Sequence, residues 1–257
     1  MLNDHSKASI AQIIFYIPTV ILALHLLYRR HGRPRLAWYI LSIFCMIRVA
    51  CGIVVLLYEN KPTSTGLLVA SIILLNAGVF PLIGATIGLI RIITYRDYNE
   101  NSSIRQGLRL ARLLFLTGIV VVIVGGSLEG SSTTSTALTG TKLAKAGYII
   151  LVVFIAVLLV FQVYFWVHLS QLSEPSRKVL RSISLAMPFI VIRLTYLFLS
   201  VFTTDEKWNE LFGETAPYVI MALMMEYIVV VIYLATGFII PSSRGVKEGI
   251  NEQVGLV

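Results

Sequence analysis

The chain has 257 residues, of which 57% are hydrophobic and only 13% are charged, whereas soluble domains typically carry about 25% charged residues. This composition excludes a soluble globular protein and predicts an all-α, polytopic membrane protein. The net charge of +8 would suit a nucleic-acid partner, but the basic residues cluster in loops beside apolar stretches. Membrane topology therefore explains the charge better than nucleic acid does.

Seven apolar stretches follow one another along the chain, with short polar breaks between them. Each is long enough to cross a hydrocarbon core of about 30 Å as a helix. The first lacks the small-residue cleavage pattern of a signal peptide, so we expect it to be retained. We predict a single transmembrane domain, 1–257, with 241–257 as a short cytoplasmic tail and spans at 9–28, 36–58, 65–93, 108–126, 143–168, 179–202 and 215–240.

Residues within and between these spans carry further expectations. The connection 127–141 is rich in Ser, Thr and Gly and is predicted to be a loop. Trp38 and Trp166 fall near the inner ends of their spans, where amphipathic rings favour the headgroup zone. Gln162 is expected to form an interhelical hydrogen bond, and Gly88 to permit close helix packing.

The basic residues alternate between the two sides of the predicted bundle, as retained positive charge does in membrane proteins. One set of connections and helix ends holds thirteen, namely Arg29, Arg30, Arg33, Arg35, Arg96, Arg105, Arg109, Arg112, Arg177, Lys178, Arg181, Arg244 and Lys247. The other set holds five: Lys7, Lys61, Lys142, Lys145 and Lys207. This asymmetry supports seven spans, with the amino terminus outside or lumenal and the carboxyl terminus cytoplasmic. The plasma membrane and the endoplasmic reticulum fit it equally well.

Four polar side chains interrupt four different apolar spans: Arg48, Asn76, Arg193 and Glu226. Each lies eleven to fourteen residues from the start of its span. Because a helix rises about 1.5 Å per residue, all four are expected near the middle of the bilayer. A charge facing lipid at that depth costs at least about 2.5 to 3.5 kcal/mol on insertion scales. The four side chains are therefore predicted to face one another inside the bundle.

The simplest interpretation of this layer is a structural ion pair between Glu226 and Arg48 or Arg193. A functional interpretation rests on the charges, because two arginines face one glutamate and an anion or a substrate oxygen would balance them. Burial and a neighbouring arginine act in opposite directions on the pKa of a carboxyl, so Glu226 could exchange a proton. Four tyrosines around Glu226 are predicted to supply hydroxyls and ring faces: Tyr164, Tyr196, Tyr227 and Tyr233.

The sequence lacks the residue motifs of several common catalytic and binding sites. The histidines have no paired carboxylates at ligand spacing, so neither a metal site nor another cofactor is expected. There is no phosphate-binding loop and no Gly-x-Ser-x-Gly motif. The seventh span has no lysine for a retinal Schiff base and no Asn-Pro pair of the large receptor class. A metal-dependent, ionising terpene cyclase is also disfavoured, because there is no aspartate-rich motif.

In size and helix number the whole chain resembles the small fungal seven-helix membrane proteins. It also resembles the membrane-bound terpene cyclases of meroterpenoid pathways, of the ascochlorin and ascofuranone type. The motifs that carry this resemblance are Arg48 in IRVACG, Asn76 in LLNAG, Arg193 in VIRLTY and Glu226 in MMEYI. The resemblance implies a metal-independent enzyme that protonates an epoxidised prenyl chain within the bilayer and guides ring closure.

On this hypothesis Glu226 is the general acid, and Arg48 and Arg193 orient it together with an acceptor oxygen. Asn76 would hydrogen-bond the apolar prenylated substrate, while tyrosine rings would stabilise carbocation character. Two alternatives from other classes are a small-molecule receptor or sensor and a lipid or metabolite transporter. For a receptor, the basic inner segments 29–35 and 95–112 could engage a cytoplasmic partner or anionic lipid.

Overall fold

The computed structural model describes residues 4–29, 35–61, 63–98, 102–129, 134–203, 206–208 and 213–240, and regular structure within them is helical. The predicted tail, 241–257, lies outside the described residues. The helices in chain order are α1 (Asp4–Arg29), α2 (Leu36–Asn60), α3 (Thr65–Ala77), α4 (Val79–Asp97), α5 (Ser102–Glu129), α6 (Thr134–Val167), η1 (Leu169–Gln171), α7 (Glu174–Phe202), η2 (Glu206–Trp208), α8 (Thr215–Pro217), η3 (Tyr218–Met224) and α9 (Met225–Ile239).

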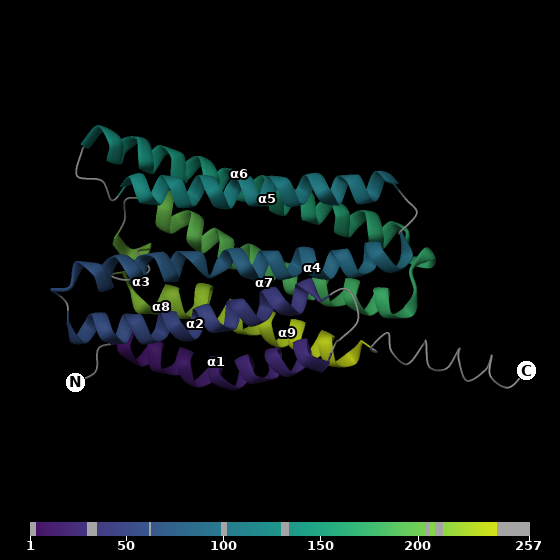
Figure 1. Ribbon diagram of the computed structural model, residues 1–257, viewed down its shortest axis with the longest axis horizontal. Coiled ribbons are helices and arrows are strands. Elements are labelled where there is room, and N and C mark those ends of the chain that lie inside the picture. The colour runs from purple at the N-terminus through teal and green to yellow at the C-terminus, as the bar shows by residue number, and fades with distance from the viewer. Residues whose placement is uncertain are drawn as a thin grey trace, which may run out of the picture.

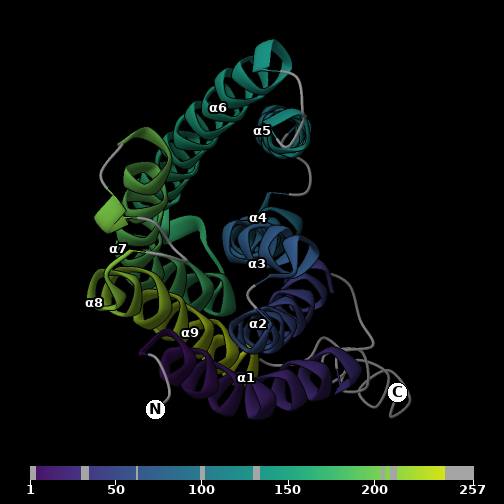
Figure 2. The same ribbon diagram turned by 90° about the vertical axis from the view of Figure 1, so that its left-hand side faces the viewer.

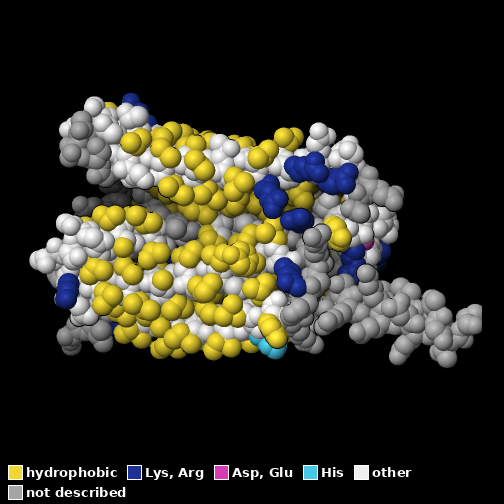
Figure 3. Space-filling view, in the orientation of Figure 1, with side chains coloured by type: hydrophobic (Ala, Val, Ile, Leu, Met, Phe, Trp, Pro, Cys, Tyr) yellow, Lys and Arg dark blue, Asp and Glu magenta, His cyan; other side chains and the backbone are white. Residues whose placement is uncertain are grey.

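The described helices form seven spans that are long and apolar enough to cross a membrane. Three elements, α8, η3 and α9, join end to end in the last span, and α3 and α4 share the third. The prediction of an all-α, seven-helix membrane protein is therefore confirmed. Large apolar side chains point outward, including Val160 at 70% exposure and Ile14 at 67%. Figure 3 shows such residues covering the middle of the bundle, as a lipid-facing surface requires. The orientation of the termini stays a prediction.

Five long helices pack in a closed order, with α1 against α2, α2 against α4, α4 against α7, α7 against α9, and α9 back against α1. A hairpin of α5 and α6 flanks this group, as the view along the bundle in Figure 2 shows. Within the hairpin the two helices pack along each other, whereas α5 has little contact with α4 (Figure 1). The five packed helices therefore enclose an interior into which polar side chains of several spans can point.

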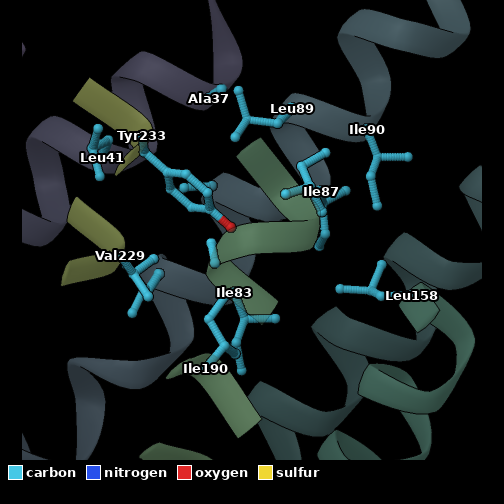
Figure 4. Packing of buried hydrophobic residues seen from close by; sticks show 14 of the residues in the cluster. Ala37, Leu41, Ile83, Ile87, Leu89, Ile90, Leu158, Ile190, Val229 and Tyr233 are labelled. Carbon is cyan, nitrogen blue, oxygen red and sulfur yellow. The ribbon is translucent and has the colours of Figure 1, made fainter. Parts of the chain in front are cut away.

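The apolar core is built from α1, α2, α4, α5, α6, α7 and α9. Ile83 and Leu41 are 0% and 1% exposed, and Val229 is fully buried. Figure 4 shows the ring of Tyr233 entering this core beside Ile83 and Val229. The Tyr233 hydroxyl and Thr86 Oγ1 are 2.6 Å apart and share a hydrogen bond. That bond satisfies a polar group that would otherwise be costly to bury.

Small residues permit the closest helix contacts, as expected for Gly88. A Cβ atom at Gly88 would lie 2.6 Å from Ala37 Cα, so α4 and α2 approach there through a glycine. A second close contact corrects the expectation for Trp38, which is only 1% exposed. Its ring packs against Gly237 of α9, where an added Cβ would lie 2.8 Å from Trp38 Cζ3. Trp38 is therefore a core residue, because a missing side chain on α9 leaves room for its ring.

The predicted loop 127–141 is largely helical, since α5 continues to Glu129 and α6 begins at Thr134. Its hydroxyls bond the carbonyl four residues earlier: Ser127 to Ile123 at 2.8 Å and Thr139 to Ser135 at 2.9 Å. Such bonds satisfy the side chain within the helix. Ser and Thr therefore extend these two helices beyond their apolar parts.

Candidate functional site

Three of the four predicted midplane side chains meet inside the bundle. Arg48 of α2 and Arg193 of α7 are each 1% exposed, and Glu226 of α9 is 0% exposed. Arg48 Nη2 donates a hydrogen bond to Glu226 Oε1. Arg193 Nε donates to the same oxygen at 2.7 Å. One carboxyl oxygen therefore links three helices, and we call Arg48, Arg193 and Glu226 the ion cluster.

The backbone at the start of the last span positions Glu226. The chain passes through one α-helical turn ending at Pro217, a π-helix over Tyr218–Met224, and then α9, where Glu226 is the second residue. A π-helix is wider than an α-helix and is frequent at functional sites. Its extra residues change the face that the following helix presents. The wide turn therefore sets the direction from which Glu226 enters the cluster.

Arg48 is seated against a glycine in the third span. Gly78 separates α3 from α4 in what the sequence predicted as one continuous helix. An added Cβ at Gly78 would lie 2.5 Å from Arg48 Cζ and from its Nη2. The guanidinium therefore packs directly on this stretch of backbone, and only glycine leaves it room. Asn76, two residues earlier, belongs to α3, but its side chain lies outside the described ones.

Gln12 of α1 adds a polar link that sequence reasoning missed. Its Nε2 donates to the Arg48 carbonyl at 2.6 Å, and its Oε1 accepts from the Tyr218 hydroxyl at 3.4 Å. Gln12 is 2% exposed and ties α1 to both α2 and the π-helix. The available signal was an amide within the first apolar span. Gln12 is only the fourth residue of the predicted span 9–28, so the sequence did not indicate that its side chain is buried inside the bundle.

Two tyrosines bring hydroxyls close to the ion cluster. Tyr227 follows Glu226, and its ring stacks on Phe15 with centroids 3.9 Å apart. Tyr16 of α1 meets the Tyr227 ring edge-on at 5.2 Å. The charges of Glu226 and Arg48 act on both hydroxyls. Neither hydroxyl has a hydrogen-bond partner within the described chain. The sequence indicated Tyr227, but it gave no reason to single out Tyr16.

The other predicted tyrosines lie in three different surroundings. Arg193 Cζ lies 5.7 Å from the centroid of the Tyr196 ring, so Tyr196 packs beside the ion cluster. Tyr233 shares its hydrogen bond with Thr86 in the apolar core, and its role in substrate binding stays a prediction. The Tyr164 ring packs on His168 at the end of α6, with centroids 4.4 Å apart. Gln162 forms the expected interhelical bond, donating to Ser184 Oγ at 2.9 Å.

The ion cluster carries two formal positive charges and one negative charge. Among the described residues, Arg48 Nε, Arg48 Nη1 and Glu226 Oε2 have no hydrogen-bond partner. Buried polar groups are ordinarily satisfied, so these three atoms are the expected contacts of a bound polar group. Donors on Arg48 suit a carbonyl, hydroxyl or ether oxygen. The described His, Cys, Asp and Glu residues form no group of three that could hold a metal ion.

Fold and site together define a seven-helix membrane protein with a charged cluster buried among α2, α7 and α9. Residues 2–243 match the family described as a domain of unknown function, DUF7702, and the chain belongs to that family. No curated protein and no solved structure matches the chain. The geometry of the site is therefore the guide to the activity of the protein.

Proposed function

We propose that the ion cluster binds the oxygen-bearing end of an apolar metabolite inside the bilayer, and that the protein is a metal-independent cyclase or isomerase. The carrying observation is the shared Glu226 oxygen, which leaves Glu226 Oε2 and two Arg48 nitrogens without partners among the described residues. The resemblance to membrane-bound terpene cyclases of meroterpenoid pathways supports an epoxidised, prenylated substrate.

In the proposed reaction the protonated form of Glu226 donates its proton from Oε2 to the epoxide oxygen, because Oε1 is held by both guanidinium groups. One C–O bond breaks and the oxygen becomes a hydroxyl. A double bond of the prenyl chain attacks the resulting cation and closes a ring. Loss of a proton to the Glu226 carboxylate then restores the acid, so the product is an isomer of the substrate.

The remaining predicted residues assist this step. Arg48 and Arg193 hold the carboxyl and orient the substrate oxygen. Asn76 would donate to the same substrate, and the ring faces of Tyr196 and Tyr227 would stabilise the cation. Burial keeps water away from that cation, since each member of the ion cluster is at most 1% exposed.

Conversion of epoxidised prenyl phenols by membranes that contain the protein tests the proposal. We expect a new product of unchanged mass with the wild type and none with Glu226→Gln, which keeps one acceptor oxygen for the arginines. Glu174→Gln is the matched control, because Glu174 is 67% exposed and lies at the start of α7. Absence of conversion across a broad panel with the wild type would contradict the enzyme.

A ligand sensor is the second candidate, favoured by the way two ion pairs tie α2 and α7 to α9. A ligand that takes over one guanidinium would release one helix from the others. If the protein is a sensor, Glu226→Gln should change the affinity for the ligand, and the wild type should show no turnover. For a purely structural ion pair the same substitution should lower only stability. The transporter alternative has no observation of its own in its favour.

A further inference from the structure

A second arginine cluster lies at the end of the bundle where α4 ends and α5 begins. There the structure has a cleft of about 190 Å³ between these two helices. Figure 3 shows basic side chains gathered around the hollow. On this side the cleft is lined by Arg91 and Tyr95 of α4 and by Tyr98, the residue that follows α4, which are spaced by four and three residues. We call this hollow the basic cleft.

The facing helix presents the same spacing. Arg105, Arg109 and Arg112 of α5 again lie four and three residues apart and line the cleft. Two matched rows therefore meet across the hollow, one of an arginine with two tyrosines and one of three arginines. A single arginine near the end of a span can extend to the headgroups by itself. Four that converge on one hollow need a further explanation.

Like charges facing across a cleft repel one another unless something of opposite charge lies between them. Within the residues that the structure describes, none of the four arginines has an ion pair or hydrogen bond, and no acidic residue lines the cleft. Asp97 lies close in sequence, but its Oδ2 accepts from the backbone nitrogen and the hydroxyl of Ser173, each at 3.2 Å. The charge of the basic cleft therefore calls for an anion.

Part of the wall of the cleft is apolar. Leu36, Ile87 and Leu108 line it beside the arginines. Ile87 lies one turn further into the span than Arg91, and Arg91 is itself six residues before the end of α4. Charged headgroups and the first part of the acyl chains occupy this depth in a bilayer. The limited contact between α4 and α5 leaves room for a chain to enter from the side. The cleft thus combines cationic side chains that can bind an anion with an apolar wall.

We propose that the basic cleft binds an anionic phospholipid, with its phosphate between the two facing rows of side chains and its acyl chain against the apolar wall. Guanidinium groups bind phosphate oxygens through paired, charge-assisted hydrogen bonds. The Tyr95 and Tyr98 hydroxyls add neutral donors. This site lies apart from the ion cluster, and the inference is independent of the proposed enzyme activity.

Titration of the purified full-length protein with phosphatidic acid, read by native mass spectrometry, tests the inference. Phosphatidylcholine with the same acyl chains is the reference lipid. We expect phosphatidic acid to bind more tightly, and Arg105→Gln/Arg109→Gln to weaken it by at least about tenfold. The matched control is Arg96→Gln/Arg181→Gln, which removes the same charge from exposed helix positions outside the cleft. All four positions are exposed, so folding should be retained.

Inorganic phosphate and glycerol 3-phosphate, added as competitors, separate a lipid from a soluble ligand. Little displacement of phosphatidic acid supports the lipid, because neither competitor reaches the apolar wall. Full displacement at similar concentration would instead indicate a soluble phosphate compound and would overturn the lipid assignment. Equal loss of affinity in the cleft and control variants would show that net charge alone is responsible, and would overturn the site itself.

Discussion

The ion cluster and the basic cleft use the same side chain in opposite surroundings. In the ion cluster two arginines are at most 1% exposed, and a glutamate from a third helix accepts from both. In the basic cleft the arginines are exposed, and no described residue neutralises them. Burial obliges the protein to supply the counter-charge itself, whereas a cleft open to the headgroup zone can obtain it from outside. The comparison separates charges needed for assembly from charges that recruit a ligand.

Among the substitutions that test this comparison, removal of the Glu226 carboxylate should lower the free energy of unfolding most. Glu226→Ala leaves two buried guanidinium groups without their shared acceptor, and we expect a loss of roughly 3 to 5 kcal/mol in the free energy of unfolding. Glu174→Ala breaks an exposed pair, 3.7 Å from Lys178, and should cost at most about 0.5 kcal/mol. Thermal unfolding of both variants in one detergent measures the difference. Similar midpoints would mean that the ion cluster does not hold the helices together.

A methyl group at Gly78 should disturb the ion cluster next most. Gly78 has ordinary helical angles, φ −60° and ψ −30°, so an effect of Gly78→Ala must come from contact with the Arg48 guanidinium. We expect a loss of roughly 1 to 3 kcal/mol. At Gly66 in α3 an added Cβ would meet nothing within 4 Å, and Gly66→Ala should be neutral or stabilise slightly. Equal unfolding midpoints for the two variants would contradict the seating of Arg48.

Two tyrosine hydroxyls sharpen the distinction between structural and ligand-binding groups. Tyr233→Phe removes the hydrogen bond with Thr86 and should cost about 1 kcal/mol of stability. Tyr227→Phe removes a hydroxyl that has no partner among the described residues, so its unfolding midpoint should stay close to that of the wild type. If the proposed reaction occurs, turnover should be largely retained in Tyr227→Phe, because the ring face that would stabilise the cation is kept. Destabilisation by Tyr227→Phe would indicate a structural hydroxyl instead.

The smallest expected effect concerns pH in the basic cleft. Burial raises the pKa of Tyr98 above its usual value, so the hydroxyl keeps its proton and stays neutral beside a bound phosphate. The affinity ratio between wild type and Tyr98→Phe for phosphatidic acid should therefore stay constant from about pH 7 to 10. Binding titrations at several pH values measure it. A ratio that falls before pH 10 would mean that Tyr98 ionises at its ordinary pKa or below.

Composition and charge were enough to predict the spans and the meeting of Arg48, Arg193 and Glu226. Each of these charges is too costly to face lipid, and helix rise fixes its depth. The same reasoning could not reveal the π-helix before Glu226 or the interruption at Gly78. The interruption at Gly78 depends on packing between segments far apart in the chain, since a guanidinium from another helix lies against Gly78.

Weaker signals failed for identifiable reasons. Tyr16 and Gln12 contribute to the site. A tyrosine or an amide costs less free energy to place in the bilayer than a charge does, so the sequence alone does not mark either residue as functional. Ser and Thr in 127–141 suggested a loop, whereas their hydroxyls bond within the helix. The position of Trp38 near a span end suggested an interface anchor, whereas its ring packs in the core against Gly237. In each case the surroundings of the side chain depend on the group that it contacts in the fold, which the residue type alone does not reveal.

The bond between Arg48 and Glu226 spans 178 positions of the chain, which has a consequence for biosynthesis. During translation both arginines emerge before the glutamate that accepts from them, because α9 follows α2 and α7 in the chain. Until then α2 and α7 carry charges that lipid does not solvate. A nascent chain that still lacks α9 therefore keeps two unneutralised cations in the membrane, a mark by which quality control could distinguish incomplete copies from finished ones.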